Sequence, residues 1–99
     1  MPPRKRIPRA SELAFQQALG QVIRETRKTR ANQDDFADQV GVYRSHMGLI
    51  EQGKLDLRLS TLLAVAQALD LPLSALIGQV ETRLAAGGPS PTPPPPDRA

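Results

Sequence analysis

The sequence has 99 residues and a net charge of +3, and it contains ten prolines, seven glycines, one histidine and no cysteine. This length favours a single domain, and the lack of cysteine excludes a disulfide framework and a cysteine-bound metal. With one histidine, His46, a multi-histidine metal centre is excluded too. No apolar run reaches the roughly 18 residues of a membrane span, and the basic N-terminus lacks the apolar segment of a secretory signal. We therefore expect a small, soluble, cytoplasmic and helical protein without a metal or cofactor.

Charge is distributed unevenly along the chain. Residues 1–30 contain eight basic and two acidic side chains, a net charge of +6, whereas residues 31–86 contain four basic and seven acidic ones, a net charge of −3. A basic segment on a mildly acidic body is typical of a protein that binds a polyanion with one face. The alternative, a short basic N-terminus that is simply solvated, is equally compatible with the charge alone.

Residues 1–10 are rich in proline and cations, and we expect them to form a flexible arm. Four cationic side chains of this arm are candidates for contacts along phosphates or in a minor groove, namely Arg4, Lys5, Arg6 and Arg9. The first helix is expected to run from Ser11, as its N-cap, to about Thr29. Its apolar residues recur at helical spacing, and they are Leu13, Leu19, Val22 and Ile23.

Two short helices are expected next, over about residues 33–40 and 44–52. Asn32 is a suitable N-cap for the first of them, and acidic residues follow in its first turn, where the helix dipole favours carboxylates. Gly41 is the residue type that ends helices in a left-handed conformation, and Gly53 closes the second helix. Two helices joined by a three- or four-residue turn that contains glycine form a helix-turn-helix.

The chain from residue 59 onward predicts two more helices. The fourth helix has apolar residues at Leu59, Leu62, Leu63, Ala66 and Leu69. The fifth helix has Pro72 in its first turn, and its apolar face consists of Leu73, Leu76, Ile77, Val80 and Leu84. The folded domain then covers residues 11–86, and the proline-rich residues 87–99 are expected to form a disordered tail. No segment alternates as a strand does, so the predicted fold class is all-α with five helices.

The second helix of the predicted helix-turn-helix leaves one face free for binding. Met47 and Ile50 are expected to point into the core. The free face contains Arg44, Ser45, Gly48, Leu49 and Gln52. Because the major groove of DNA admits one helix, residues near the N-terminal end of such a helix reach base edges.

Four segments resemble the lambda-repressor-like helix-turn-helix domains (xenobiotic-response-element-like, Cro/C1-type) of bacterial and phage regulators. They are LGQVIRETRK at 19–28, NQDDFADQVGV at 32–42, YRSHMGLIEQG at 43–53 and LSTLLAVAQALDLPLSALI at 59–77. The resemblance covers about two-thirds of the chain. It implies a five-helix lambda-repressor-like domain that acts as a sequence-specific transcriptional regulator. In the leading interpretation this regulator is a repressor that binds a pseudo-palindromic operator in double-stranded DNA as a homodimer, on the nucleoid in the cytoplasm.

The resemblance also implies roles for individual residues. Bases are expected to be read by Arg44, Ser45, Gly48 and Leu49. The DNA backbone is expected to be contacted by Gln33, Gln52 and Lys54, to which we add Tyr43, His46 and Arg58. A partly buried structural ion pair is implied between Glu51 and Arg27, with Arg24 as the alternative partner.

The chain departs from the family pattern at three places. The link between the first two helices is about one residue shorter than usual and lacks glycine. Tyr43 stands where a serine or threonine usually caps the recognition helix. Arg58 stands where a cap usually precedes the fourth helix, which leaves Asp56 as the substitute cap.

Two classes of function remain open at the level of sequence. Some relatives of this domain are antitoxins, which bind a toxin and repress their own operon, and others bind protein with little contact to DNA. An enzyme has no support, because the sequence contains no nucleophile–base pair, metal cluster or phosphate-binding loop. For the homodimer, the candidate surface is residues 73–84, since Val80 and Leu84 extend the apolar face beyond the usual end of the domain.

Overall fold

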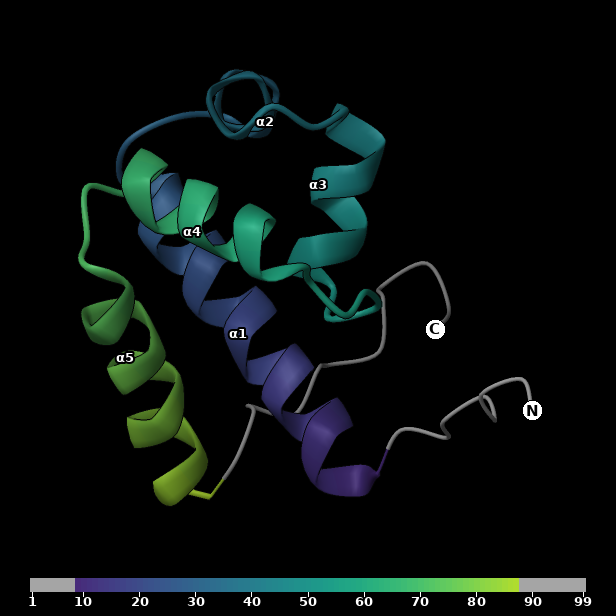
Figure 1. The fold of residues 1–99 in the computed structure, drawn as a ribbon, viewed down its shortest axis with the longest axis vertical. Coiled ribbons are helices and arrows are strands. Elements are labelled where there is room, and N and C mark those ends of the chain that lie inside the picture. The colour runs from purple at the N-terminus through teal and green to yellow at the C-terminus, as the bar shows by residue number, and fades with distance from the viewer. Residues whose placement is uncertain (1–8, 88–99) are drawn as a thin grey trace, which may run out of the picture.

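The computed structural model describes residues 9–87, and in this part of the chain five helices follow one another without a strand (Figure 1). This confirms the predicted all-α fold. Three cations of the arm, Arg4, Lys5 and Arg6, and the tail from residue 88 onward lie outside the described residues. Between residues 9 and 87 no single helix is long and apolar enough to cross a membrane. The fourth and fifth helices meet that requirement only as a pair, bent by 97° at their junction.

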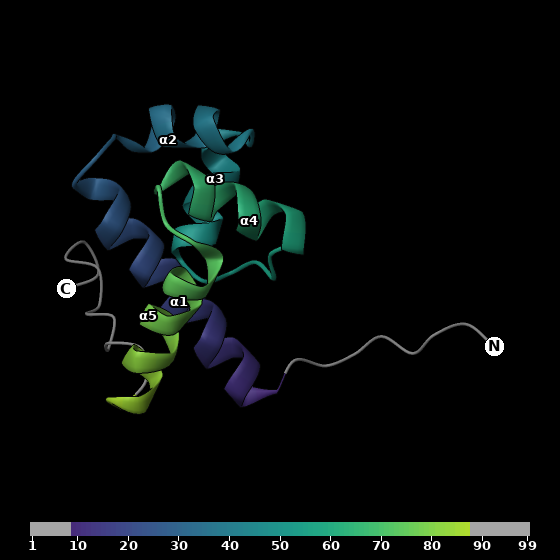
Figure 2. The same cartoon turned by 60° about the vertical axis from the view of Figure 1, so that its left-hand side comes forward.

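Helix α1, Ala10–Lys28, is the longest, and α5, Leu73–Ala85, packs along it (Figures 1 and 2). The N-cap of α1 is Arg9, so the prediction of Ser11 as the cap was wrong by two residues. The reason is that Glu12 accepts a hydrogen bond from the backbone N–H of Arg9 at 3.2 Å. An acidic residue three positions after the N-cap satisfies a backbone donor that the helix leaves free, so the helix begins earlier.

Helices α2, Gln33–Val40, and α3, Arg44–Glu51, form the predicted helix-turn-helix. The Asn32 side chain accepts a hydrogen bond from the backbone N–H of Asp35 at 2.8 Å, which confirms it as the N-cap of α2. Gly41 has a φ of 92°, in the left-handed region that glycine tolerates best, and it ends α2 as predicted. One side-chain cap therefore starts α2, and one glycine ends it at the turn before α3.

Helix α4, Leu59–Ala68, differs from the prediction in how much of its apolar face is buried. Val65 and Ala66 are buried, but Leu59 is 72% exposed and Leu63 is 44% exposed. Side chains of a helix lean toward its N-terminus, so the side chain of its first residue points past the end of α4, away from the core. The N-cap is Arg58, which makes no side-chain cap bond, so Asp56 does not replace it in that role.

The apolar face of α5 is used inside the protomer. Pro72 is the N-cap of this helix and not a residue of its first turn. Val80 is fully buried in the core, and Leu84 is partly buried against it. Val80 and Leu84, on which the assignment of the dimer surface to residues 73–84 rested, thus pack inside the protomer, where α5 lies along α1. The dimer surface itself stays a prediction.

Three hydrogen bonds from Arg83 fasten α5 to α1. The Arg83 guanidinium donates to Gln21 Oε1 at 3.0 Å and to Glu25 Oε2 at 2.9 Å. A further bond joins the Arg83 guanidinium to the other Glu25 oxygen. The hydrogen bond from Arg83 lowers the pKa of the Glu25 carboxyl below its ordinary value.

The core takes at least one fully buried side chain from every helix of the described chain. These side chains include Ile23, Phe36, Met47, Val65 and Leu76. Helix α1 approaches the end of α3 closely at Gly20, where a Cβ atom would lie 2.6 Å from two carbonyl oxygens of α3. Gly53, with a φ of 73°, meets the α1 backbone in a similar way, since a Cβ there would lie 2.6 Å from the Cα of Gln17. Two glycines thus let α3 end directly on α1.

Candidate nucleic-acid interface

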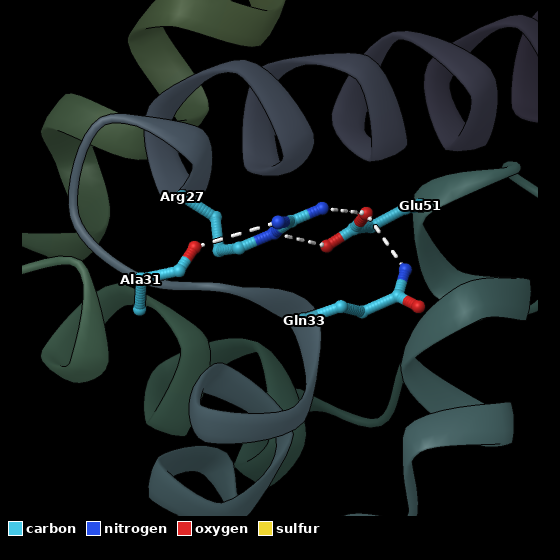
Figure 3. Close-up of polar contacts among 4 residues, drawn as sticks. All are labelled: Arg27, Ala31, Gln33 and Glu51. Carbon is cyan, nitrogen blue, oxygen red and sulfur yellow. Dashed lines mark hydrogen bonds and ion pairs between the residues drawn. The ribbon is translucent and has the colours of Figure 1, made fainter.

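A buried ion pair fixes α3 to the rest of the domain (Figure 3). Glu51, the last residue of α3, is 7% exposed, and Arg27 of α1 is 8% exposed. Arg27 Nε donates to Glu51 Oε2 at 3.0 Å, and Arg27 Nη2 donates to Glu51 Oε1 at 2.7 Å. The structure thus pairs Glu51 with Arg27, while the alternative partner Arg24 is exposed.

The same carboxylate also reaches α2. Gln33, the first residue of α2, donates from Nε2 to Glu51 Oε1 at 3.1 Å (Figure 3). Arg27 Nη1 adds a weaker bond to the carbonyl oxygen of Ala31, at 3.4 Å, in the link before α2. A buried charge must be paired and hydrogen-bonded to be tolerated, so this network holds α1, α2 and α3 in one arrangement. The Gln33 side chain was expected at a DNA phosphate. In the structure, one of its two amide protons is used in this hydrogen bond within the protein.

Helix α3 divides into a buried and an exposed side. Met47, Ile50 and Glu51 face inward. The predicted base-reading residues Ser45 and Leu49 are exposed, as is Gln52 just after the helix, and Leu49 leaves 39% of its surface in solvent. Gly48 is half-buried, and a Cβ built on it would meet nothing within 4 Å. The structure therefore brings these positions together on one open helix face.

Arg44, the first residue of α3, lies beside α2. Its Nε is 3.2 Å from Asp34 Oδ1 in the first turn of α2, and the two side chains are 68% and 63% exposed. His46 is exposed as well. Two residues along an α-helix are separated by about 200° around its axis, so His46 and Arg44 emerge on opposite flanks of α3.

The expected backbone contacts surround this face. Tyr43, the N-cap of α3, is 85% exposed and makes no cap bond through its side chain. Lys54 and Arg58, in the link between α3 and α4, are both exposed. Arg9 of the arm is exposed at the start of α1, far along the chain from α3. Among residues 9–87, no group of three or more acidic, histidine or cysteine side chains is placed to hold a metal ion.

Comparison with known proteins identifies this arrangement. No protein-family model matches the sequence, and no curated protein matches it significantly. Among solved structures, the clp gene regulator ClgR from Corynebacterium glutamicum is similar at a TM-score of 0.69 with 19% identity, over 73% of this chain and 78% of that chain. The hypothetical transcription factor NHTF from Neisseria is similar at a TM-score of 0.64 with 23% identity, over 84% of this chain and 94% of that chain. At these identities the likeness shows the fold.

A third neighbour decides the family. The restriction-modification controller protein C.AhdI from Aeromonas hydrophila is 32% identical, over 66% of this chain and 96% of that chain, at a TM-score of 0.62. The chain belongs to the XRE/Cro-type helix-turn-helix transcription regulators. The resemblance stated from the sequence is thereby confirmed, and α3 of this XRE/Cro-type regulator is the second helix of its helix-turn-helix.

Three features of the interface were missed by sequence reasoning. The contact of Asp34 with Arg44 and that of Gln33 with Glu51 join residues on different helices, and no spacing in the sequence indicates them. Gly20 carried a signal that was not used. A glycine inside an otherwise helical pattern often marks a close approach of another segment, and here that segment is the end of α3.

Proposed function

We propose that this regulator is a sequence-specific repressor that binds a pseudo-palindromic operator as a homodimer, with α3 in the major groove. The observation that carries the proposal is the exposed face of α3, held against α1 and α2 by the buried pair of Glu51 with Arg27. A recognition element must keep its geometry while it exchanges water for base edges, and a rigid helix does this better than a loop.

Base recognition is assigned to four positions at or near the N-terminal half of α3. Arg44 donates two parallel hydrogen bonds to guanine O6 and N7, the commonest specific contact in the major groove. Leu49 meets a thymine methyl group, and Ser45 donates to or accepts from a base edge. Gly48 allows the helix backbone to come close to the bases, since it carries no side chain on that side.

Phosphate contacts surround this group and position it. The first turn of a helix leaves backbone N–H groups without a partner in the helix, and phosphates bind well to such helix ends, so the N-terminus of α2 at Gln33 is assigned to a phosphate. The exposed side chains assigned to the backbone are Tyr43, His46, Gln52, Lys54 and Arg58. The arm residues Arg4, Lys5, Arg6 and Arg9 extend the contact along the backbone or into a minor groove. Such contacts supply affinity but carry no sequence information.

The homodimer follows from the energetics of base readout. Each good bidentate contact discriminates by only about 1–3 kcal/mol, so one helix cannot select an operator from a genome. Two copies related by a two-fold axis double the contacts, and their half-sites then lie about 34–36 Å apart. Repression is the simplest outcome, because a bound dimer blocks a promoter by occupancy alone. Binding to the chromosome places the protein in the cytoplasm with the nucleoid.

Selection from a random pool of DNA duplexes tests the proposal. The full chain is used at two salt concentrations, beside Arg44→Ala and a matched control, Arg24→Ala, which removes an exposed arginine of α1. For the wild type and for Arg24→Ala, we expect one palindrome to be enriched at both salt concentrations. For Arg44→Ala, we expect a weaker sequence preference at one base pair of each half-site. Sedimentation of the operator complex should give two chains per duplex.

The same experiment has a result that would refute the proposal. If no motif is enriched at either salt concentration, the chain does not read DNA sequence. A capture experiment for a protein partner, such as a toxin, would then be the next step.

A further inference from the structure

The contact between Asp34 and Arg44 joins the two helices of the helix-turn-helix at their N-terminal ends. Asp34 is the second residue of α2, and Arg44 is the first residue of α3. Arg44 Nε lies 3.2 Å from Asp34 Oδ1, while more than half of each side chain is exposed. Among residues 9–87, the Arg44 guanidinium is therefore largely open, and the charged group beside it is the Asp34 carboxylate.

The atom that Asp34 holds decides which hydrogen-bond donors stay free. A guanidinium has five N–H donors in a rigid planar fork. The Asp34 carboxylate forms an ion pair on the Nε side of this fork, so the N–H groups of the two terminal nitrogens remain available. Bidentate binding of guanine needs two donors of one plane at O6 and N7 together. An arginine already positioned by an ion pair loses less rotational freedom on binding than one that is free.

The position of this carboxylate also argues against a simple role in DNA affinity. Asp34 lies in the part of α2 that is proposed to approach phosphates, where a negative charge repels the DNA backbone. Asp35, the next residue, has the same charge, lies in the same helical turn and is exposed. Its contact with the Asn32 cap uses only the backbone N–H. Asp34 thus differs from Asp35 by its ion pair with Arg44.

We propose that Asp34 is a specificity-determining residue, which orients the Arg44 guanidinium so that it selects guanine over the other bases. This inference rests on the proposed function, because it requires that Arg44 reads a base. Asp34 acts through Arg44 and touches no base itself. Its charge lowers the affinity for DNA of any sequence, while its ion pair with Arg44 raises the preference for one base.

The test measures affinity for the selected operator and for the three duplexes that replace the guanine read by Arg44. Fluorescence anisotropy at fixed salt is applied to the full-length wild type, Asp34→Asn, Asp35→Asn, Arg44→Ala and the Asp34→Asn/Arg44→Ala double variant. Exposed ion pairs are weak, so we expect Asp34→Asn to reduce the guanine preference about two- to fivefold. Asp35→Asn should keep the wild-type preference, and both single Asp variants should bind all four duplexes more tightly than the wild type.

The double variant distinguishes orientation from a general effect of charge. If Asp34 acts through Arg44, the double variant has the same base preference as Arg44→Ala. If Asp34→Asn and Asp35→Asn have equal base preference while Arg44→Ala loses it, the inference about Asp34 is wrong and the proposed function stands. If Arg44→Ala keeps the guanine preference, or no operator exists, Arg44 reads no base, and both proposals are overturned. Thermal unfolding of both Asp variants shows that each is folded.

Discussion

Removal of the Glu51 carboxylate by Glu51→Ala should destabilise the protein strongly. The side chain accepts three hydrogen bonds, two from Arg27 and one from Gln33, and both charged residues are less than 10% exposed. Without Glu51, the Arg27 guanidinium is left buried without a counter-charge. Breaking a buried pair in this way costs about 3–5 kcal/mol, a large part of the roughly 5–15 kcal/mol that stabilises an ordinary domain.

Urea unfolding followed by far-ultraviolet circular dichroism measures this loss. For a domain of this size, each kcal/mol lowers the Tm by about 4–8 °C, so a Tm at least about 12 °C lower is expected as well. Glu81→Ala, which removes an exposed acidic residue of α5, is the matched control. It should change the free energy of unfolding by no more than about 0.5 kcal/mol.

A double substitution separates the lost pair from the lost volume. Arg27→Met combined with Glu51→Leu removes both charges and keeps apolar bulk at both positions, and such replacements are often neutral or stabilising. We expect it to recover most of the stability that Glu51→Ala loses. The reasoning would be refuted by a loss below about 1 kcal/mol for Glu51→Ala, or by a double variant no more stable than the single one.

Three further predictions concern packing, pH and salt. Gly20→Ala should lower the free energy of unfolding by about 1–3 kcal/mol or more, because its Cβ would lie 2.6 Å from carbonyl oxygens of α3. Gly78→Ala, whose Cβ would meet nothing within 4 Å, should instead stabilise α5 by up to about 1 kcal/mol. Equal Tm values for the two variants would contradict this prediction. The hydrogen bond from Arg83 lowers the pKa of Glu25 in the folded state. The ionised Glu25 therefore stabilises the fold above the ordinary glutamate pKa, and this stabilisation is lost as the pH falls through the lowered pKa of the folded state. Because Glu25 is exposed, the effect is only about 0.2–1 kcal/mol, and urea unfolding of Glu25→Gln should show a shallower loss of stability in acid than the wild type. If a dimer neutralises about six phosphates, a plot of log affinity against log salt concentration should have a slope near −5. Lys54→Ala should make this slope shallower without changing base preference. An unchanged slope would mean that Lys54 does not contact the DNA backbone.

The local signals in the sequence were sufficient for the helix-turn-helix itself. Asn32 as a cap and Gly41 as a left-handed terminator depend on backbone chemistry within one turn, so they could be predicted without the tertiary structure. The pairing of Glu51 with Arg27 came from the family resemblance, because these residues are 24 positions apart in the sequence.

Features that depend on how helices cross could not be predicted in this way. The bond of Asp34 to Arg44 requires the relative position of two helix N-termini, which the packing of α2 on α3 determines. The exposure of Leu59 follows from where α4 begins relative to the edge of the core. Val80 belonged to an apolar face predicted correctly, but only the structure shows that α1 covers it.

Interference by methylation at guanine N7 tests the central claim most directly, because N7 lies in the major groove. Operator duplexes, methylated at random and labelled at one end, are bound by the wild type or by Arg44→Ala, and bound and free DNA are compared. If Arg44 reads the major groove, methylation of one guanine in each half-site should prevent the wild type from binding. The two guanines should lie symmetrically about the operator centre. Arg44→Ala, compared with the wild type at equal occupancy, should lose this sensitivity. If no guanine interferes, or if Arg44→Ala shows the same pattern as the wild type, α3 does not read the major groove through Arg44.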